Sequence, residues 1–249
     1  MWSGGGDKYS FRNQHLAGER NFFSLATALA PLMDQAGKSE ITDVLIPSHL
    51  AVAEKAINDI YCAKLGLFEW TEEVATLFEE IDALMEATEV DYTMFWRQLS
   101  SLPGEFIPSS SSSASSDDIS GSELMGRMTE VFYHKLSPEE INRWSLLLHR
   151  WLKVLQSQVQ TARSSSEGVD LSGAAITARM CRVNPKYVPR EWMLVEAYQA
   201  AAQGNHRPLK RLQDLFETPY DEHTPEDERD FYRKMPMDLL DTGGVTTMT

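Results

Sequence analysis

Apolar residues recur at intervals of three and four along most of this 249-residue chain, the spacing that one face of an α-helix requires. Nowhere do four to eight β-branched or aromatic residues alternate with polar ones between turn signals, as in a half-buried strand. The pattern therefore predicts an all-α fold. In the longest predicted helix, the buried face consists of Ile141, Trp144, Leu148, Trp151 and Leu155.

Capping residues mark where the predicted helices begin. Pro47 opens a segment that Gly66 closes, and Thr71 precedes an acidic helix start. Asp91 is a suitable N-cap, and the tetrad 137–140 (Ser-Pro-Glu-Glu) is a capping box with proline at the first helical position. The predicted helices include residues 92–99, 138–161, 191–203 and 206–216. In the segment from Pro47 to Gly66 and in the helix that Thr71 precedes, apolar residues fall on one face. They are Leu50, Ala53, Ile57, Ile60, Tyr61 and Leu65 in the first, and Val74, Leu77, Phe78, Ile81, Leu84 and Met85 in the second.

A serine-rich stretch divides the chain. Nine of the fifteen residues from 108 to 122 are serine, and such a run cannot bury enough apolar surface to offset its ordering entropy. We expect a mobile linker or surface insertion; a phosphorylation switch is the alternative. The predicted organisation is a helical segment 1–107, the serine-rich linker 108–122 and a helical extension 123–249.

Composition excludes several classes of protein. The net charge of -14 argues against nucleic-acid binding, which needs a basic surface. No apolar run reaches the ~18 residues of a membrane span, so we expect no membrane partner. The first residues carry neither a signal core nor a transit-peptide pattern. Cys62 and Cys181 lie far apart without metal-ligand spacing, which favours two buried free thiols over a disulfide or metal site.

A search for catalytic motifs finds none of the common ones. Residues 4–6 (Gly-Gly-Gly) are interpreted as a flexible end rather than a phosphate cradle, and Lys55 of the kinase-like 52–55 tetrapeptide sits in a helical pattern. The acidic residues Asp221, Glu222, Glu226 and Asp227 are interpreted as a solvated loop. The histidines share no helical pairing that suits a metal: His15, His49, His134, His149, His206 and His223. We therefore predict no catalytic, nucleotide-binding or metal-binding residue and no cofactor in this chain.

The segment 179–192 is the most unusual part of the sequence. Pro185 and Pro189 fix φ and push the preceding residues out of the helical region, so a rigid extended connector interrupts the helices. Four cations surround it: Arg179, Arg182, Lys186 and Arg190.

This connector resembles the Asn-Pro-Lys-Tyr/Phe-Val-x-Arg segment of the selenoprotein O family. The resemblance continues, in order, in residues 7–14, 63–67, 91–100, 220–222 and 232–236. The chain departs from the family at His15, which replaces a proline, and at 19–20, where Glu-Arg replaces an apolar pair. A charged pair there is costly if it is buried.

The resemblance implies a pseudokinase that transfers AMP from ATP, with Mg²⁺, to Ser, Thr or Tyr of protein substrates. It implies the helical C-lobe of a kinase-like fold without the β-rich N-lobe, with 1–107 following the activation segment. The family's catalytic residues precede the element at 7–14, so none is carried over. We expect an inactive C-terminal fragment, from a truncated product or an incomplete gene model; the alternative is a non-catalytic helical protein-interaction module.

The resemblance also implies where and with what the chain acts. Eukaryotic members are typically mitochondrial, and otherwise a cytoplasmic location is expected. A helical lobe without its partner lobe exposes apolar surface, which predicts self-association. The family often ends in a selenocysteine tail, so an in-frame UGA codon after Thr249 is one expectation and natural loss of the tail is the other.

Overall fold

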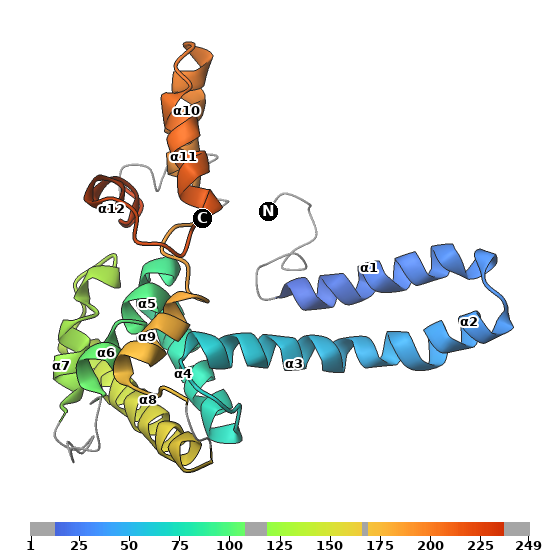
Figure 1. The fold of residues 1–249 in the computed structure, drawn as a ribbon, viewed down its shortest axis with the longest axis horizontal. Helices are drawn as coiled ribbons and strands as arrows, with labels where there is room; N and C mark the ends of the chain where they lie inside the picture. Colours follow the sequence, from blue (N-terminus) through green and yellow to red (C-terminus); the bar gives the residue numbers. More distant parts are fainter. Residues whose placement is uncertain (1–12, 108–118, 166–168, 237–249) are drawn as a thin grey trace. The chain divides into compact units, whose positions relative to one another are not determined.

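The computed structural model describes residues 13–107, 119–165 and 169–236, and these residues are mostly helical. Within them the one isolated β-bridge joins Val90 and Phe132, and no strand forms. The all-α prediction is confirmed. In chain order the elements are α1 (Gln14–Leu29), η3 (Ala30–Leu32), α2 (Gln35–Glu40), η4 (Ile41–Leu45), α3 (Ile46–Lys64), α4 (Glu72–Ala87), α5 (Tyr92–Leu99), α6 (Leu102–Phe106), α7 (Gly121–Gly126), η6 (Thr129–Val131), α8 (Pro138–Ser165), α9 (Gly173–Cys181), α10 (Glu191–Ala202), α11 (Arg207–Glu217) and α12 (Pro225–Phe231) (Figure 1).

Contacts divide the chain into two units, Met1–Ile60 and Tyr61–Thr249. The predicted division at the serine run differs from this one. Residues 108–118 lie outside the described part, as do the glycines at 4–6 and the C-terminal tail, but Ser120 caps α7 at Glu123. Side chains on both sides of the run share one core: Leu102, Ile107, Leu124 and Met128.

The first unit is a helical hairpin. Helix α1 lies beside α2 and the start of α3 (Figure 1), and the Phe22 ring stacks on His49 at a centroid distance of 5.3 Å. Among its described residues, those that are buried are Ala17 and Ala26. The 19–20 pair is not buried, since Glu19 is half-buried and Arg20 exposed. Ile60, on the predicted apolar face, is 57% exposed.

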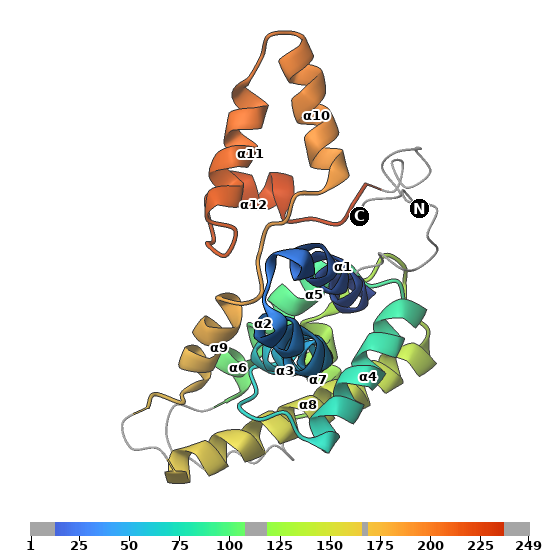
Figure 2. The same ribbon diagram turned by 90° about the vertical axis from the view of Figure 1, so that its right-hand side faces the viewer.

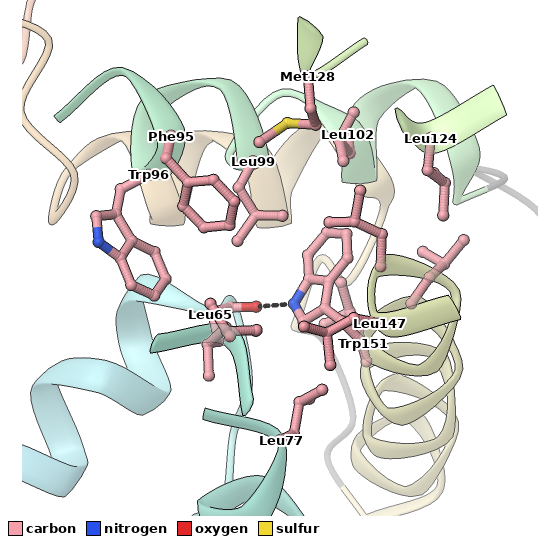
Figure 3. Packing of buried hydrophobic residues seen from close by; sticks show 14 of the residues in the cluster. Leu65, Leu77, Phe95, Trp96, Leu99, Leu102, Leu124, Met128, Leu147 and Trp151 are labelled. Atoms are coloured by element: carbon pink, nitrogen blue, oxygen red, sulfur yellow. Dashed lines mark hydrogen bonds between the residues drawn. The ribbon is translucent and has the colours of Figure 1, made fainter. Parts of the chain in front are cut away.

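The second unit is built around α8, which packs against α4 and α7. Four residues of the predicted buried face are buried: Trp144, Leu148, Trp151 and Leu155. Ile141 is 40% exposed, because it lies in the first turn of α8, at the edge of the core. Trp151 donates its indole N–H to the Leu65 carbonyl at 2.9 Å, which joins α8 to the end of α3 (Figure 3). The helix continues to Ser165, beyond the predicted end at 161.

The predicted caps are confirmed by their hydrogen bonds. The Thr71 hydroxyl accepts from the Val74 N–H at 3.3 Å, and the Asp91 carboxylate accepts from the Met94 N–H at 3.0 Å. In the box at 137–140, the Ser137 hydroxyl accepts from the Glu140 N–H while the Glu140 carboxylate accepts from the Ser137 N–H. Local sequence therefore sets the starts of α4, α5 and α8.

Helices α10 and α11 form a hairpin whose apolar side chains make a second, smaller core (Figure 2). Gly204, at φ +81°, follows α10, which ends at Ala202, one residue before the predicted end at 203. The buried members of this core are Tyr187, Trp192, Met193, Ala197, Leu212, Leu215 and Met235.

Candidate functional site

The connector between α9 and α10 is extended, as its two prolines predict. Residues 182–190 form no helix, and Pro185 and Pro189 lie within them. The backbone N–H groups of Lys186 and Tyr187 both donate to the Pro219 carbonyl, at 2.9 and 3.1 Å. The connector is thereby fixed to the loop that follows α11.

Asn184 lies at the centre of a buried polar cluster. Its side-chain amide donates to the Lys64 carbonyl at 3.0 Å and to the Ser100 hydroxyl at 2.9 Å. Its amide oxygen accepts from the Lys64 ammonium at 2.7 Å. Asn184 is fully buried, so these bonds satisfy polar atoms that water does not reach. One side chain therefore ties the connector to both α3 and the end of α5.

Lys64 is a buried cation whose hydrogen-bond acceptor is a neutral amide. It is 9% exposed, and its ammonium lies 5.0 Å from the centre of the Trp96 ring. Burial lowers the pKa of Lys64 from 10.5 to about 8, because the charged form loses solvation. The aromatic face and the amide stabilise the charge only in part.

Arg97 of α5 joins three segments of the chain. Its guanidinium donates to the carbonyls of Cys181 and Asn184, at 3.1 and 3.0 Å. It also donates to the Tyr220 carbonyl at 3.1 Å and to the Glu222 carboxylate. The planar fork of an arginine suits such a set of acceptors better than a lysine would.

Glu222 bridges two buried cations. Its carboxylate accepts from Arg97 and, at 2.5 Å, from Lys186, whose ammonium also lies 3.0 Å from Glu228. Desolvation raises the pKa of Glu222, but the hydrogen bonds from Lys186 and Arg97 outweigh it, so the pKa is lowered. The carboxylate itself is 69% exposed, while both cationic side chains are under 10% exposed.

Arg190 forms the second ion pair of the cluster. Its guanidinium binds both oxygens of Asp91, at 2.5 and 2.7 Å, and both side chains are largely buried. The Tyr133 hydroxyl donates to the same carboxylate at 3.1 Å. Desolvation lowers the pKa of Arg190, but the bond to Asp91 outweighs it and the pKa is raised. Asp91 thus acts both as the cap of α5 and as a buried counter-ion.

The four cations in and around the connector bind different partners. Arg179 donates to the Gly66 carbonyl, with its guanidinium 3.9 Å from the centre of the Phe68 ring. Lys186 and Arg190 point into the ion pairs described above, and Arg182 is exposed and donates to the Ala178 carbonyl of its own helix. Three of the four charges therefore fix the fold.

Comparison with known proteins gives the family. The family model "Protein adenylyltransferase SelO" matches residues 3–217. The chain belongs to the SelO family. Among curated relatives, a "Protein nucleotidyltransferase YdiU" from Aromatoleum aromaticum is 31% identical over 88% of this chain and 36% of its own length. Proteins of the same name from Stutzerimonas stutzeri and Vibrio cholerae are 27% and 29% identical, over 86% and 92% of this chain.

The match covers 36% of the length of the Aromatoleum aromaticum relative and 36% of that from Stutzerimonas stutzeri. The chain therefore spans under two-fifths of the length of these two SelO-family relatives. Lys64, Arg97 and Asn184 lie within the residues that the SelO model matches, and Glu222 lies just beyond them. The resembling segments 63–67, 91–100 and 220–222 therefore converge on the connector. The sequence signal for this cluster was present in the SelO-like segments, but their mutual contacts were not predicted.

The acidic residues after α11 were interpreted as a solvated loop, but two of them also form ion pairs. Glu222 bridges Arg97 and Lys186, and Asp227 pairs with Arg211 at 2.8 Å and accepts from the Thr224 hydroxyl at 2.6 Å. The side chains beside Arg211 line a surface pocket of about 270 Å³: Asp214, Leu215, His223, Thr224, Glu226 and Asp227. The carboxylates that line this pocket lie beside Arg211, which already pairs with Asp227 and Asp230.

Several other predicted features can be placed in this SelO-family chain. Cys62 is buried, whereas Cys181 is half-buried rather than buried, because it ends α9 at the connector. Lys55 lies in α3 and pairs with Asp59. Among residues 13–107, 119–165 and 169–236, no three His, Cys, Asp or Glu side chains are grouped to hold a metal ion. In the same ranges, no helix combines the length and apolarity of a membrane span.

Proposed function

We propose that this chain is the helical, non-catalytic C-lobe portion of a protein nucleotidyltransferase with a kinase-like fold. The whole protein would transfer AMP from ATP to hydroxyl groups of protein substrates. The observation that carries the proposal is the SelO-model match over residues 3–217, together with the relatives named as protein nucleotidyltransferases.

ATP and Mg²⁺ are assigned in this proposal to other parts of the whole protein. A nucleotidyl transfer requires a Gly-rich phosphate loop, a lysine and metal-binding acidic or amide groups. The described residues do not fit a bound Mg²⁺, since no three His, Cys, Asp or Glu side chains among them are grouped to hold a metal ion. No catalytic step is therefore assigned to a residue of this chain.

The role of the chain in such an enzyme is support. The cluster around Asn184 fixes the ends of α3, α5 and α9 against each other through buried hydrogen bonds. A rigid helical layer of this kind holds the geometry of a neighbouring active site within the small tolerance that catalysis needs.

The test has two arms. The 249-residue chain is incubated with α-labelled ATP, Mg²⁺ and a mixture of proteins, and no labelled protein is expected. The Aromatoleum aromaticum relative is then truncated to remove its matching region, and this chain is added in trans. Restored labelling would agree with a structural role of this chain beside the active site. Labelling by the chain alone overturns its non-catalytic assignment, and a stable complex that remains inactive overturns the proposal.

A further inference from the structure

The C-terminal hairpin, defined as residues 187–236, has a core of its own. Its buried apolar residues form a cluster separate from the main core of the second unit. Two partly buried tyrosines link the clusters: Tyr232 packs against both, and Tyr133, which lies outside the hairpin, packs against the hairpin's cluster. The hairpin is therefore joined to the rest of the unit by little apolar contact, and polar contacts carry more of the attachment.

Two ion pairs make that attachment, and they run in opposite directions. Asp91, at the start of α5, receives Arg190 from the hairpin. Glu222, in the hairpin, receives Arg97 of α5 and Lys186 of the connector. Each side thus supplies one carboxylate and one arginine to the other.

Two further hydrogen bonds join the hairpin to residues that precede α8. They add to the bond from Arg97 to the Tyr220 carbonyl and to the contacts of Lys186 with Pro219 and Glu228. Lys234 donates to the Phe132 carbonyl, and the Met235 N–H donates to the Tyr133 hydroxyl at 3.3 Å. The hydroxyl of Tyr133 in turn donates to Asp91, so this contact depends on the first ion pair. The charged groups at the junction are Asp91, Arg97, Lys186, Arg190, Glu222, Glu228 and Lys234.

We propose that the C-terminal hairpin is a latched unit, held by the Asp91–Arg190 and Glu222–Arg97 pairs, that undocks as a whole while the main core stays folded. Breaking either pair leaves a largely buried arginine without its counter-ion, which is costly, and breaking both removes the two ion pairs that join α5 to the hairpin. Undocking exposes the buried side chains of Lys186 and Arg190 to solvent. This inference does not depend on the proposed function.

Native-state trypsin digestion tests the latch on the full chain. Lys186 and Arg190 are 4% and 12% exposed when the hairpin is docked, so trypsin reaches them only after undocking. Cleavage after Arg150, within α8, reports opening of the main core instead. Asp91→Asn with Glu222→Gln removes both charges, and asparagine still caps α5.

In this double variant we expect the cleavage rate after Lys186 and Arg190 to rise at least about tenfold, the factor that a modest loss of docking free energy produces. Cleavage after Arg150 should stay unchanged. The control Asp230→Asn removes an ion pair with Arg211 that lies inside the hairpin, and it should leave all three rates unchanged.

Three results would overturn the latch. Equal acceleration at Arg150 would mean that the hairpin and the core open together. No acceleration at Lys186 and Arg190 would mean that the ion pairs do not hold the hairpin. Acceleration by Asp230→Asn as large as that of the double variant would mean that any loss of charge in the hairpin has the same effect.

Discussion

Lys64 and Asn184, 120 positions apart in the chain, exchange two hydrogen bonds in the buried centre of the second unit. The ammonium of Lys64 donates to the Asn184 side chain, which donates back to the Lys64 carbonyl. A long-range pair of this kind fixes the end of α3 against the connector. Its loss leaves polar groups that have no access to water.

Removing the Asn184 amide tests this relationship. Asn184→Ala removes the amide oxygen that accepts from the Lys64 ammonium and the amide N–H that donates to the Ser100 hydroxyl, although that hydroxyl keeps its bond to the Trp96 carbonyl. We expect the free energy of unfolding to fall by about 3 kcal/mol. Urea denaturation followed by far-UV circular dichroism measures the change. The control Asn142→Ala changes an exposed position of α8 and should be neutral. Equal stability of the two variants would contradict the assigned role.

The lowered pKa of Lys64 makes stability depend on pH in a defined direction. Its pKa is about 8 when folded and 10.5 when unfolded, so between these values the unfolded chain binds the extra proton. The free energy of unfolding therefore rises with pH across this window, by up to about 3 kcal/mol. Below pH 8 the lysine is charged in both states and the contribution is constant.

Comparison with Lys64→Met isolates this effect. Burial raises the pKa of Tyr187 to about 12 and also raises that of Tyr232, so both act in the opposite direction above pH 10, and they do so in both proteins. The difference between wild type and variant should shift in favour of wild type from pH 8 to pH 10.5. Chemical denaturation at a series of pH values measures it, and a constant difference would show that Lys64 does not change its protonation on folding.

Local features of this fold were predictable because each rests on neighbouring residues. The caps at Thr71, Asp91 and Ser137 satisfy N–H groups three residues away, and Gly204 ends its helix through its own backbone freedom. The polar cluster joins residues separated by 36 to 125 positions. No periodicity carries that information.

The errors follow the same physical division. Ile141 and Ile60 match the helical spacing of their neighbours, but the packing of other helices decides which part of the face is covered. Glu222 is exposed as interpreted, but its ion pairs were missed because its partners, Arg97 and Lys186, come from distant segments. Resemblance to the SelO family located these segments without revealing that they meet.

Gly66 allows a close approach between the end of α3 and α9. Its φ is +75°, and a Cβ atom there would lie 2.6 Å from the Met180 sulfur. Gly66→Ala is expected to destabilise the fold by about 3 kcal/mol, through both the left-handed backbone and the forced repacking. Gly204→Ala is the matched control: its φ is +81° but nothing lies within 4 Å, so only the backbone cost of ~1 kcal/mol remains. Thermal unfolding compares the two, and equal losses would contradict the packing role of Gly66.

The apolar surface of the first unit predicts self-association. Large side chains on its helices are exposed, among them Leu25 at 56%, Leu32 at 84% and Val52 at 66%. Exposed apolar side chains that gather into a patch drive association in water. We therefore expect concentration-dependent oligomers in sedimentation velocity at micromolar concentrations. Leu25→Glu with Val52→Glu should shift the protein to monomer, because a charge at the contact is costly to desolvate.

Leu146→Glu controls for the general effect of added negative charge on a chain whose net charge is already -14. Leu146 is 63% exposed on α8, in the second unit, so its replacement should leave the oligomers in place. A monomeric wild type at every concentration would contradict the prediction. Equal dissociation by the Leu146 variant would instead show that added negative charge disperses the oligomers wherever it is placed, so the apolar side chains of the first unit would not be the contact.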